Sequence, residues 1–326
     1  MQCKSLISVI RLFKINMNPI REFYLKTRNI LIPACMALFF SCEEDRQAPV
    51  PAYLQINEFQ FQGEEPDSTG YPTQRISDVW IFVNNQIIGT YSIPTGKIPV
   101  IAEGKARVSI QAGIFTDGMR KNRVYYPFYK AYEQDVVLEK GKTKILTPHF
   151  FFLPAWKSKS LKIPFTFYED FEVLNEKMIQ GDAGTVQPVT AIHSNTALRK
   201  LYGNRYLEIR TVKDDDVIDV TNDVYLPLET NGNPVYLEFD YKSTCPVQVG
   251  LRGKVGNSFT GIAQDLILYP NSEWTKIYVS LSEETGLFHT EALFQQQPAT
   301  FRFFLRTIPA PGANNTLCID NIRLLN

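Results

Sequence analysis

The sequence predicts an all-β protein with two β-sandwich domains in tandem. Apolar residues alternate with polar ones in many short segments, and this period of two places successive side chains on opposite faces of a strand. Gly, Asn, Asp and Pro residues separate these segments at positions suited to turns. The 326-residue chain is long enough for two ordinary domains, and no convincing helix of ten or more residues follows its N-terminal signal region.

The N-terminal region carries the pattern of a cleaved export signal, which predicts that residues 1–41 are removed. Basic residues between positions 21 and 28 precede an uncharged apolar stretch over residues 30–40. This stretch is about half of the roughly 20 residues that a membrane-spanning helix needs, which disfavours a single-pass anchor. A buried core helix is the other alternative. Met17 lies shortly before the signal, so residues 1–16 are either part of the protein or an extension ahead of its true start.

The apolar stretch ends at Ser41 and Cys42, which resembles the lipobox of bacterial lipoproteins. Cleavage in that family leaves a lipid-modified cysteine at position one, and the resemblance assigns this role to Cys42. Each buried methylene of an acyl chain contributes about 0.8 kcal/mol, so two or more chains hold a protein on a membrane. The acids after Cys42 resemble the surface-export signal of Bacteroidota lipoproteins, which implies a surface-exposed anchor in the outer membrane. Residues 42–52 are polar and contain proline, as expected of a short tether.

Replacing the cysteine tests the anchor. Cys42→Ser removes the thiol that an acyl chain needs, so the variant is expected to leave the membrane fraction or to stay unprocessed. Membrane fractionation and the mass of the mature N-terminus measure both outcomes. Unchanged maturation together with unchanged membrane retention would refute the prediction.

The formal charge of zero conceals an asymmetry along the chain. Residues 1–41 hold six basic residues and one acid; subtracting them from the 34 basic and 34 acidic residues of the chain leaves 28 and 33. The remainder therefore has a net charge of −5 and no dense basic patch. Nucleic acid is excluded as an expected partner.

Removal of the signal also leaves two free thiols. Cys3 and Cys35 are lost with the signal and Cys42 is acylated, so Cys245 and Cys318 remain. In an oxidising compartment these two residues either form a disulfide or serve as small core residues within their apolar strands.

The polar, proline-flanked segment 153–164 predicts a linker between the two domains. It separates a small Ig- or prealbumin-like β-sandwich over residues 53–152 from a second domain over residues 165–326. In the first domain, strands are expected at 53–61, 78–84, 86–93, 106–114, 123–129, 134–139 and 144–152.

Residues 78–91 of the first domain predict a hairpin whose turn is Asn84–Asn85, because Asn tolerates positive φ. A strand, a Glu-Gly-Lys turn and a second strand follow over residues 98–114. A short hairpin followed by EGKARVSIQAG resembles the small seven-stranded modules called PEGA or prealbumin-like domains. The resemblance implies a spacer or an interaction module.

Five motifs follow one another in the second domain and together resemble the galactose-binding-like jelly roll of many carbohydrate-binding modules. An opening Phe-Glu and a closing Asp-Asn-Ile strand bracket that family's domain. The resemblance covers residues 165–326 and implies a jelly-roll fold. The motifs are YEDFE (168–172), GNRYLEI (203–209), YLEFDYKS (236–243), EWTKIYVSL (273–281) and TLCIDNIRLL (316–325).

The best candidate for a helix in the second domain is the segment 282–297.

No catalytic constellation is recognisable in the sequence. The three histidines lie far apart without metal-ligand spacing, and no nucleophile elbow, phosphate loop or zinc-protease motif is present. Adjacent acids such as Glu283 and Glu284 would point to opposite faces of a strand. The protein is therefore expected not to be an enzyme.

A structural calcium ion is implied by the jelly-roll resemblance. In many such modules the opening Glu and the closing Asp hold calcium together with backbone carbonyls, and these positions correspond to Glu172 and Asp320. Calcium takes six to eight oxygen ligands, so two carboxylates and carbonyls suit it. The alternative is that Asp320 caps a turn and Glu172 is solvated. The acids at 214–216 are interpreted as a solvated loop.

The outward faces of the second domain's strands supply candidates for a ligand site. A sugar site needs aromatic faces beside hydrogen-bonding groups. Trp274, the only tryptophan of the second domain, is interpreted as a packing residue and is not counted among these aromatic faces. The alternative is a cross-strand charge ladder in which Glu238 and Asp240 face Arg302 and Arg306, worth roughly 0.2–1 kcal/mol per pair. The candidates are Tyr236, Glu238, Asp240, Arg252, Arg302, Phe304 and Arg306.

Together these features favour a lipid-anchored cell-envelope protein that binds or scaffolds, with its jelly roll contacting a glycan or a protein partner. The alternative is an accessory or hydrolytic component of a polysaccharide-uptake system, and a purely structural role is a third. Two carboxylates about 5–10 Å apart in a cleft would favour a glycosidase. Exposed Tyr and Phe side chains would favour binding.

Overall fold

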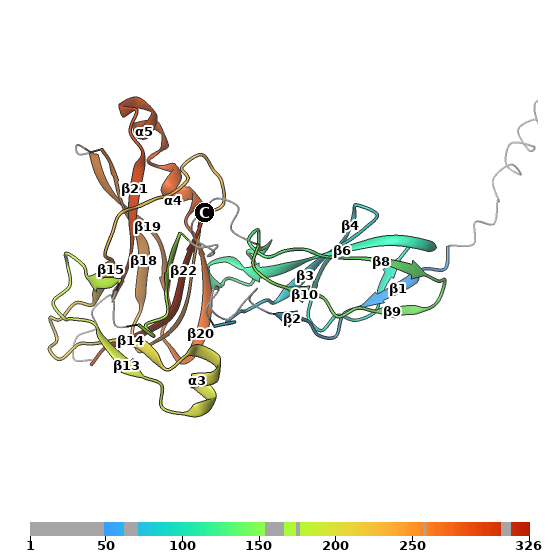
Figure 1. Ribbon diagram of the computed structural model, residues 1–326, viewed down its shortest axis with the longest axis horizontal. Coiled ribbons are helices and arrows are strands. Elements are labelled where there is room, and N and C mark those ends of the chain that lie inside the picture. Colours follow the sequence, from blue (N-terminus) through green and yellow to red (C-terminus); the bar gives the residue numbers. More distant parts are fainter. Residues whose placement is uncertain (1–48, 62–70, 154–165, 174–176, 257–258, 308–313) are drawn as a thin grey trace, which may run out of the picture. The chain divides into compact units, whose positions relative to one another are not determined.

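The computed structural model describes residues 49–61, 71–153, 166–173, 177–256, 259–307 and 314–326 (Figure 1). The predicted signal, Cys42, and nearly all of the predicted linker lie outside these residues. The chain from Pro51 to Asn326 forms one compact unit. Strands dominate it, which confirms the prediction of an all-β fold.

The N-terminal part, residues 51–153, contains three sheets. A five-stranded sheet has the order β4-β3-β6-β7, with β8 also on β6, while β5-β1-β9 and β10-β2 form two small sheets. The strands are β1 (Ala52–Gln55), β2 (Gln60–Phe61), β3 (Asp78–Val83), β4 (Gln86–Ser92), β5 (Ile98–Val100), β6 (Gly104–Phe115), β7 (Arg123–Tyr125), β8 (Tyr132–Leu138), β9 (Thr143–Ile145) and β10 (His149–Phe150).

The predicted hairpin between β3 and β4 is confirmed. Asn84 and Asn85 have φ values of 50° and 64°, the left-handed conformation that a two-residue hairpin turn requires. The expected single strand over residues 53–61 is instead two short strands in different sheets. The chain leaves the first of them at Ile56, whose N–H donates to the Thr95 hydroxyl at 2.9 Å rather than to a neighbouring strand.

The C-terminal part, residues 166–326, is built on two six-stranded sheets. The junction sheet has the order β13-β14-β22-β17-β20 with β11 also on β22, and the arginine sheet has the order β12-β15-β21-β18-β19 with β16 also on β21. The junction strands are β11 (Phe167–Glu169), β13 (Val189–Ile192), β14 (Arg205–Arg210), β17 (Tyr236–Ser243), β20 (Asn271–Ser280) and β22 (Thr316–Leu325). The arginine-sheet strands are β12 (Met178–Gln180), β15 (Asp219–Asn222), β16 (Leu226–Pro227), β18 (Val247–Val255), β19 (Phe259–Leu268) and β21 (Ala299–Thr307).

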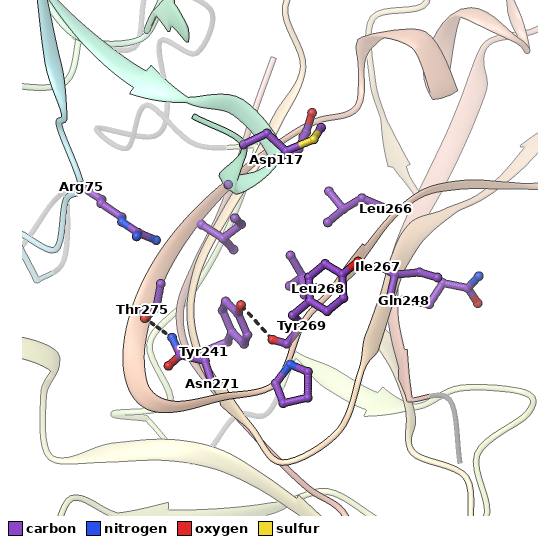
Figure 2. A pocket seen from close by; sticks show the side chains of 14 residues that line it. Arg75, Asp117, Tyr241, Gln248, Leu266, Ile267, Leu268, Tyr269, Asn271 and Thr275 are labelled. Carbon is purple, nitrogen blue, oxygen red and sulfur yellow. Dashed lines mark hydrogen bonds between the residues drawn. The ribbon is translucent and has the colours of Figure 1, made fainter. Parts of the chain in front are cut away.

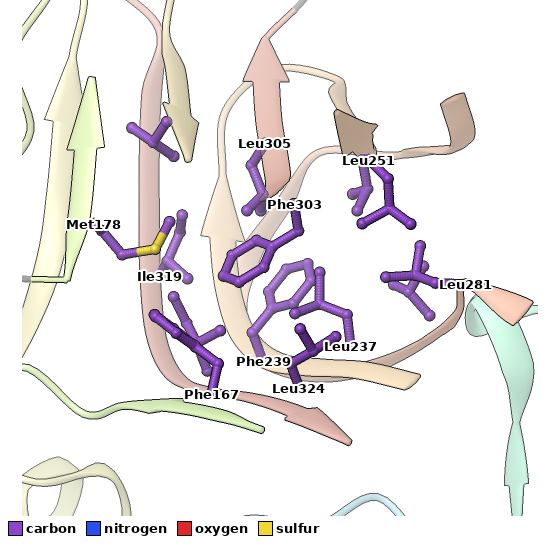
Figure 3. Packing of buried hydrophobic residues seen from close by; sticks show 14 of the residues in the cluster. Phe167, Met178, Leu237, Phe239, Leu251, Leu281, Phe303, Leu305, Ile319 and Leu324 are labelled. Atoms are coloured by element: carbon purple, nitrogen blue, oxygen red, sulfur yellow. The ribbon is translucent and has the colours of Figure 1, made fainter. Parts of the chain in front are cut away.

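One hydrophobic core lies between these two sheets (Figure 3). Leu237 and Phe239 of β17 point into it from the junction sheet, and Phe303 and Leu305 of β21 point into it from the arginine sheet. Each strand delivers every second residue, as the alternation in the sequence predicts. A separate core fills the N-terminal part.

Helices are short throughout the described residues. The segment that the sequence favoured as helical contains α4 (Ser282–Gly286) and α5 (His289–Gln295). A further helix, α3 (Thr196–Tyr202), was not expected; Asn195 caps it by accepting the Leu198 N–H at 2.9 Å.

Four charged side chains on the outward face of the junction sheet are buried against the N-terminal part. Glu238, Asp240, Lys276 and Arg323 are at most 4% exposed, and we call them the buried charge quartet. Lys276 Nζ lies 3.3 Å from Glu238 Oε2 and 3.9 Å from Asp240 Oδ2. Arg323 Nη1 lies 3.7 Å from Glu238 Oε2. Two acids and two bases thus balance one another away from water.

The N-terminal part supplies the remaining partners of the quartet. The Tyr126 hydroxyl donates to Glu238, and Thr73 accepts from Lys276 Nζ at 3.3 Å. Burial raises the pKa of Asp240, and Lys276 beside it opposes that rise. Burial lowers the pKa of Lys276, and Asp240 opposes that change. Each charge is therefore tolerated because its opposite lies next to it.

Cys245 and Cys318 are buried and form no disulfide. Of the two alternatives for these thiols, the structure therefore shows small core residues. Burial raises the pKa of the Cys318 thiol to about 11 and also raises the pKa of Cys245. The reactive thiolate is therefore scarce at neutral pH.

Removing one member of the quartet is expected to destabilise the protein strongly. Glu238→Ala leaves Lys276 and Arg323 without this carboxylate, and breaking a buried ion pair costs about 3–5 kcal/mol. Urea unfolding of the purified protein measures the loss. Glu133→Ala is the matched control, because Glu133 pairs with Arg107 at the surface and its side chain is 50% exposed. An equal and small effect of both substitutions would contradict the role of the quartet.

The thiols are expected to resist alkylation in the folded protein. Iodoacetamide at pH 7.5 should modify neither Cys245 nor Cys318, whereas urea-unfolded protein should react at both. Mass spectrometry of the two samples measures this. A mass that shows a disulfide, or rapid labelling of the folded protein, would be inconsistent with two buried thiols.

Candidate functional site

The outward face of the arginine sheet gathers charged and aromatic side chains from neighbouring strands. On β21, alternate residues point away from the core, and β18 lies beside it in antiparallel register. Arg252 lies opposite Arg302 across the two strands, and Gly250 lies opposite Phe304. We call this surface the arginine face. Its members are Asp219, Tyr225, Arg252, Lys254, Arg302, Phe304 and Arg306.

Phe304 forms the base of the arginine face. Its ring is fully buried because Gly250 opposite leaves room for it; a Cβ at Gly250 would come within 2.7 Å of the ring. The guanidinium groups of Arg252 and Arg306 lie 4.6 and 5.3 Å from the ring centroid. The aromatic ring thus holds both cations by cation–π attraction.

Asp219 holds the same two arginines from the side. Its Oδ2 accepts hydrogen bonds from Arg252 Nη2 at 2.6 Å and from Arg306 Nη2 at 3.1 Å. The carboxylate is fully buried, and β15 places it opposite Arg306 in register. One carboxylate therefore orients two guanidinium groups.

A second aromatic–cation group continues the face. The Tyr225 ring has Lys254 Nζ at 4.2 Å and the Arg302 guanidinium at 4.7 Å from its centroid. Arg302 also donates to the backbone carbonyl of Asp223. The face thus combines four basic side chains with the single carboxylate of Asp219.

Arg252 is the most constrained cation of the face. The residue is 7% exposed, and its Nη1 has no hydrogen-bond partner among the described residues. The Nη1 atom is also shielded from solvent, so Arg252 is a fixed part of the face, and the cations that reach solvent are Lys254, Arg302 and Arg306.

The structure separates the seven predicted ligand residues into two groups. Arg252, Arg302, Phe304 and Arg306 are brought together on the arginine face. Tyr236, Glu238 and Asp240 lie on the junction sheet, where the N-terminal part covers them and their exposure is at most 7%. Contacts from a distant part of the chain could not be anticipated from strand alternation alone.

The predicted charge ladder is wrong. Glu238 and Asp240 lie on β17 and face Lys276, whereas Arg302 and Arg306 lie on β21 in the other sheet. The two sets are on opposite outer faces of the sandwich, so they cannot pair. Alternation assigns a residue to a face, but it does not assign a strand to a sheet.

Sequence reasoning missed three members of the arginine face, Asp219, Tyr225 and Lys254. The strand that carries Asp219 has only four residues, too few for a clear period of two. Lys254 could have been predicted from the alternation along β18, because it is the next outward position after Arg252.

Glu172 and Asp320, the predicted calcium ligands, are already engaged. Glu172 accepts from the Asn204 N–H at 2.5 Å, from the Asn204 side chain at 2.9 Å and from the Arg205 N–H at 2.8 Å. Asp320 is fully buried, with Oδ2 2.8 Å from His193 Nε2 and Oδ1 accepting from Asn321 N–H at 2.8 Å. Burial raises the pKa of Asp320, and the neighbouring carboxylates of Asp240 and Glu172 raise it further.

Calcium binding at this pair stays a prediction. Within the described residues, no group of three or more His, Cys, Asp or Glu side chains is arranged to hold a metal ion.

His193 and Asp320 adjoin an aromatic cluster. The His193 ring lies 4.7 Å from Tyr206 and 5.1 Å from Trp274, centroid to centroid. Burial lowers the pKa of His193 to about 4, so its imidazole is neutral at pH 7. Trp274 contacts these rings edge-on, as expected of a packing residue.

No helix among the described residues combines the length and the hydropathy needed to cross a membrane.

No protein-family model matches the chain, and no curated protein matches it. Solved structures similar to it include a family 11 carbohydrate-binding module from Clostridium thermocellum in complex with a β-1,3-1,4-mixed-linked tetrasaccharide. The identity is 17% and the TM-score 0.32, over 48% of this chain and 93% of the module. A second is a promiscuous carbohydrate-binding module of the β-sandwich superfamily, with 14% identity and a TM-score of 0.34 over 77% and 85% of the two chains.

A third similar structure is a xylan-binding domain of family 22, with 12% identity and a TM-score of 0.31 over 50% of this chain and 94% of the domain. These three structures are carbohydrate-binding β-sandwich modules. At such identities and TM-scores, their ligands are not transferred to this chain.

Proposed function

We propose that this chain is a non-catalytic, lipid-anchored cell-envelope protein that binds an acidic glycan on the arginine face. The observation that carries the proposal is a face of four basic side chains against one carboxylate, on which Lys254, Arg302 and Arg306 reach solvent. A uronic acid residue supplies both a carboxylate for a guanidinium and hydroxyl groups for the neighbouring polar side chains.

The charge balance of the face supports an acidic glycan over a neutral one. Asp219 is shared by Arg252 and Arg306, which leaves the basic side chains in excess. Lys254 and Arg302, partly exposed, flank Tyr225 at the other end of the face. Successive acidic units of a polymer could therefore meet successive cations along β18 and β21.

The cavity chemistry supports binding over hydrolysis. Glycosidases generally use a pair of carboxyl groups about 5–10 Å apart. A cavity between β19, β20 and the Thr116–Gly118 turn has Asp117 as the one carboxylate in its lining, and Asp219 on the arginine face is committed to two arginines.

Attachment to the membrane through Cys42 stays part of the proposal. The lipobox resemblance and the acids behind Cys42 support a Bacteroidota-type lipoprotein at the outer-membrane surface, with residues 42–52 as the tether. The N-terminal part would then act as a spacer. The buried charge quartet supports a firm connection between this spacer and the glycan-binding sandwich.

Binding to polygalacturonate tests the proposed function. The purified protein is expected to bind this acidic polymer, and added salt should weaken binding because the contacts are charged. Arg306→Gln is expected to weaken it at least about tenfold, since a hydrogen bond to a charged group contributes about 1.5–3 kcal/mol and 1.4 kcal/mol is tenfold. Isothermal titration calorimetry measures both.

Arg210→Gln is the matched control, because Arg210 is an exposed arginine on the junction sheet and should leave binding unchanged. Circular dichroism confirms that each variant is folded. Folded wild-type protein that binds no acidic glycan, or an Arg306→Gln variant that binds as well as wild type, would overturn the proposal.

A further inference from the structure

A cavity of about 810 Å³ lies beside the junction of the N-terminal and C-terminal parts (Figure 2). Its walls come from β19 and β20, from the turn between these strands, and from the 3₁₀ turn η1 (Thr116–Gly118) with Arg75 of the N-terminal part. This volume lies within the roughly 300–1,000 Å³ of small-molecule sites. None of the seven ligand residues predicted from the sequence lines it.

An exposed tyrosine ring stands in the cavity wall. Tyr269 is 81% exposed although it is large and partly apolar. Its backbone is held in place, since the Tyr241 hydroxyl donates to the Tyr269 carbonyl at 3.3 Å and Pro270 follows directly (Figure 2). A flat aromatic face presented to solvent beside a cavity is suited to stacking on an apolar ligand face.

Planar polar groups surround this ring. Gln248 and Asn271 line the cavity from β18 and β20, and Asn271 donates to the Thr275 hydroxyl on the same strand (Figure 2). Leu268 and Ile277 provide apolar surface between them. Amide and hydroxyl groups around an aromatic face are the groups that hydrogen-bond sugar hydroxyls while the ring covers the C–H face.

The N-terminal wall is anchored on the junction sheet. The backbone N–H of Arg75 donates to the Tyr278 hydroxyl at 2.9 Å, and Asp117 accepts from the Ser280 N–H at 3.2 Å. Gly118 has a φ of 69° and would place a Cβ 3.0 Å from Ile277, so only glycine fits this turn closely. The wall that the N-terminal part contributes to the cavity is therefore formed without a ligand.

The cavity differs from the arginine face in charge. Its lining contains one cation, Arg75, and one carboxylate, Asp117, so the formal charges cancel. Burial raises the pKa of Asp117, and the hydrogen bond from the Ser280 N–H opposes that rise. An acidic ligand gains little here, whereas a neutral polyhydroxylated ligand finds both donors and acceptors.

We propose that this cavity is a second binding site, which takes a neutral oligosaccharide of a few sugar units stacked on Tyr269. The site adjoins one end of the arginine face, where Gln248 lies opposite Arg306, and is completed by Arg75 and Asp117 from the N-terminal part. A neutral glycan bound here contacts both parts of the compact unit, and therefore stabilises their association by mass action.

Neutral tetrasaccharides with β-1,4 and mixed β-1,3-1,4 linkages are the probes. Isothermal titration calorimetry and saturation-transfer NMR with the purified protein are expected to show binding of at least one of them. Tyr269→Ala should weaken binding at least tenfold, whereas Tyr269→Phe keeps the ring and should retain it. Tyr125→Ala is the matched control, since Tyr125 is a half-exposed tyrosine of β7 outside the cavity lining.

The arginine-face variant separates this site from the proposed function. Arg302→Gln, at the Tyr225 end of the face, should bind the neutral tetrasaccharide as wild type does, and Tyr269→Ala should still bind polygalacturonate. Folded wild-type protein that binds none of the probes at millimolar concentration, or binding unaffected by Tyr269→Ala, would overturn the second site. Loss of neutral-sugar binding in Arg302→Gln but not in Tyr269→Ala would place that binding on the arginine face and likewise overturn it.

Discussion

The buried charge quartet is the constraint around which the compact unit is organised. Glu238, Asp240, Lys276 and Arg323 occupy the outward face of the junction sheet, where an isolated sandwich would leave them in water. Burial of any one of them alone would be prohibitive, but two acids and two bases at short distance compensate each other's charge. The Tyr126 hydroxyl and Thr73 complete the network from the N-terminal part. The N-terminal part therefore has a specific polar counterpart on the sandwich.

This use of one sheet leaves the other sheet for binding. Because the N-terminal part covers the outward face of β17, β20 and β22, charged groups available to a polymer concentrate on β18 and β21. There, Phe304 and Asp219 orient two guanidinium groups, and Gly250 makes the close approach of the ring possible. Contact between the two parts also forms one wall of the cavity beside Tyr269, because hydrogen bonds hold Arg75 and Asp117 of the N-terminal part on β20. Association of the two parts thus shapes the cavity, whereas the arginine face is built within the sandwich.

Several features of the fold could be derived from local sequence. The period of two located most of the long strands, and the Asn84–Asn85 pair identified the turn of the first hairpin because positive φ is costly for most other residues. Short elements escaped this reasoning. β1 and β2 appear as one run in the sequence, but their partners are in different sheets. α3 is a seven-residue helix without buried residues, so no apolar stripe announces it.

The sequence by itself determined the all-β class, the alternation that forms the core, and which of the outward residues carry charge. These depend on local backbone geometry and on side-chain polarity, which neighbouring residues report. Only the tertiary structure decided which outward charges are covered. Glu238 and Arg302 have the same pattern along their strands, yet one is buried in the quartet and the other lies beside Tyr225 on the arginine face. The difference arises because sheet membership and domain contact depend on residues distant in the chain, whose pairing no local period encodes.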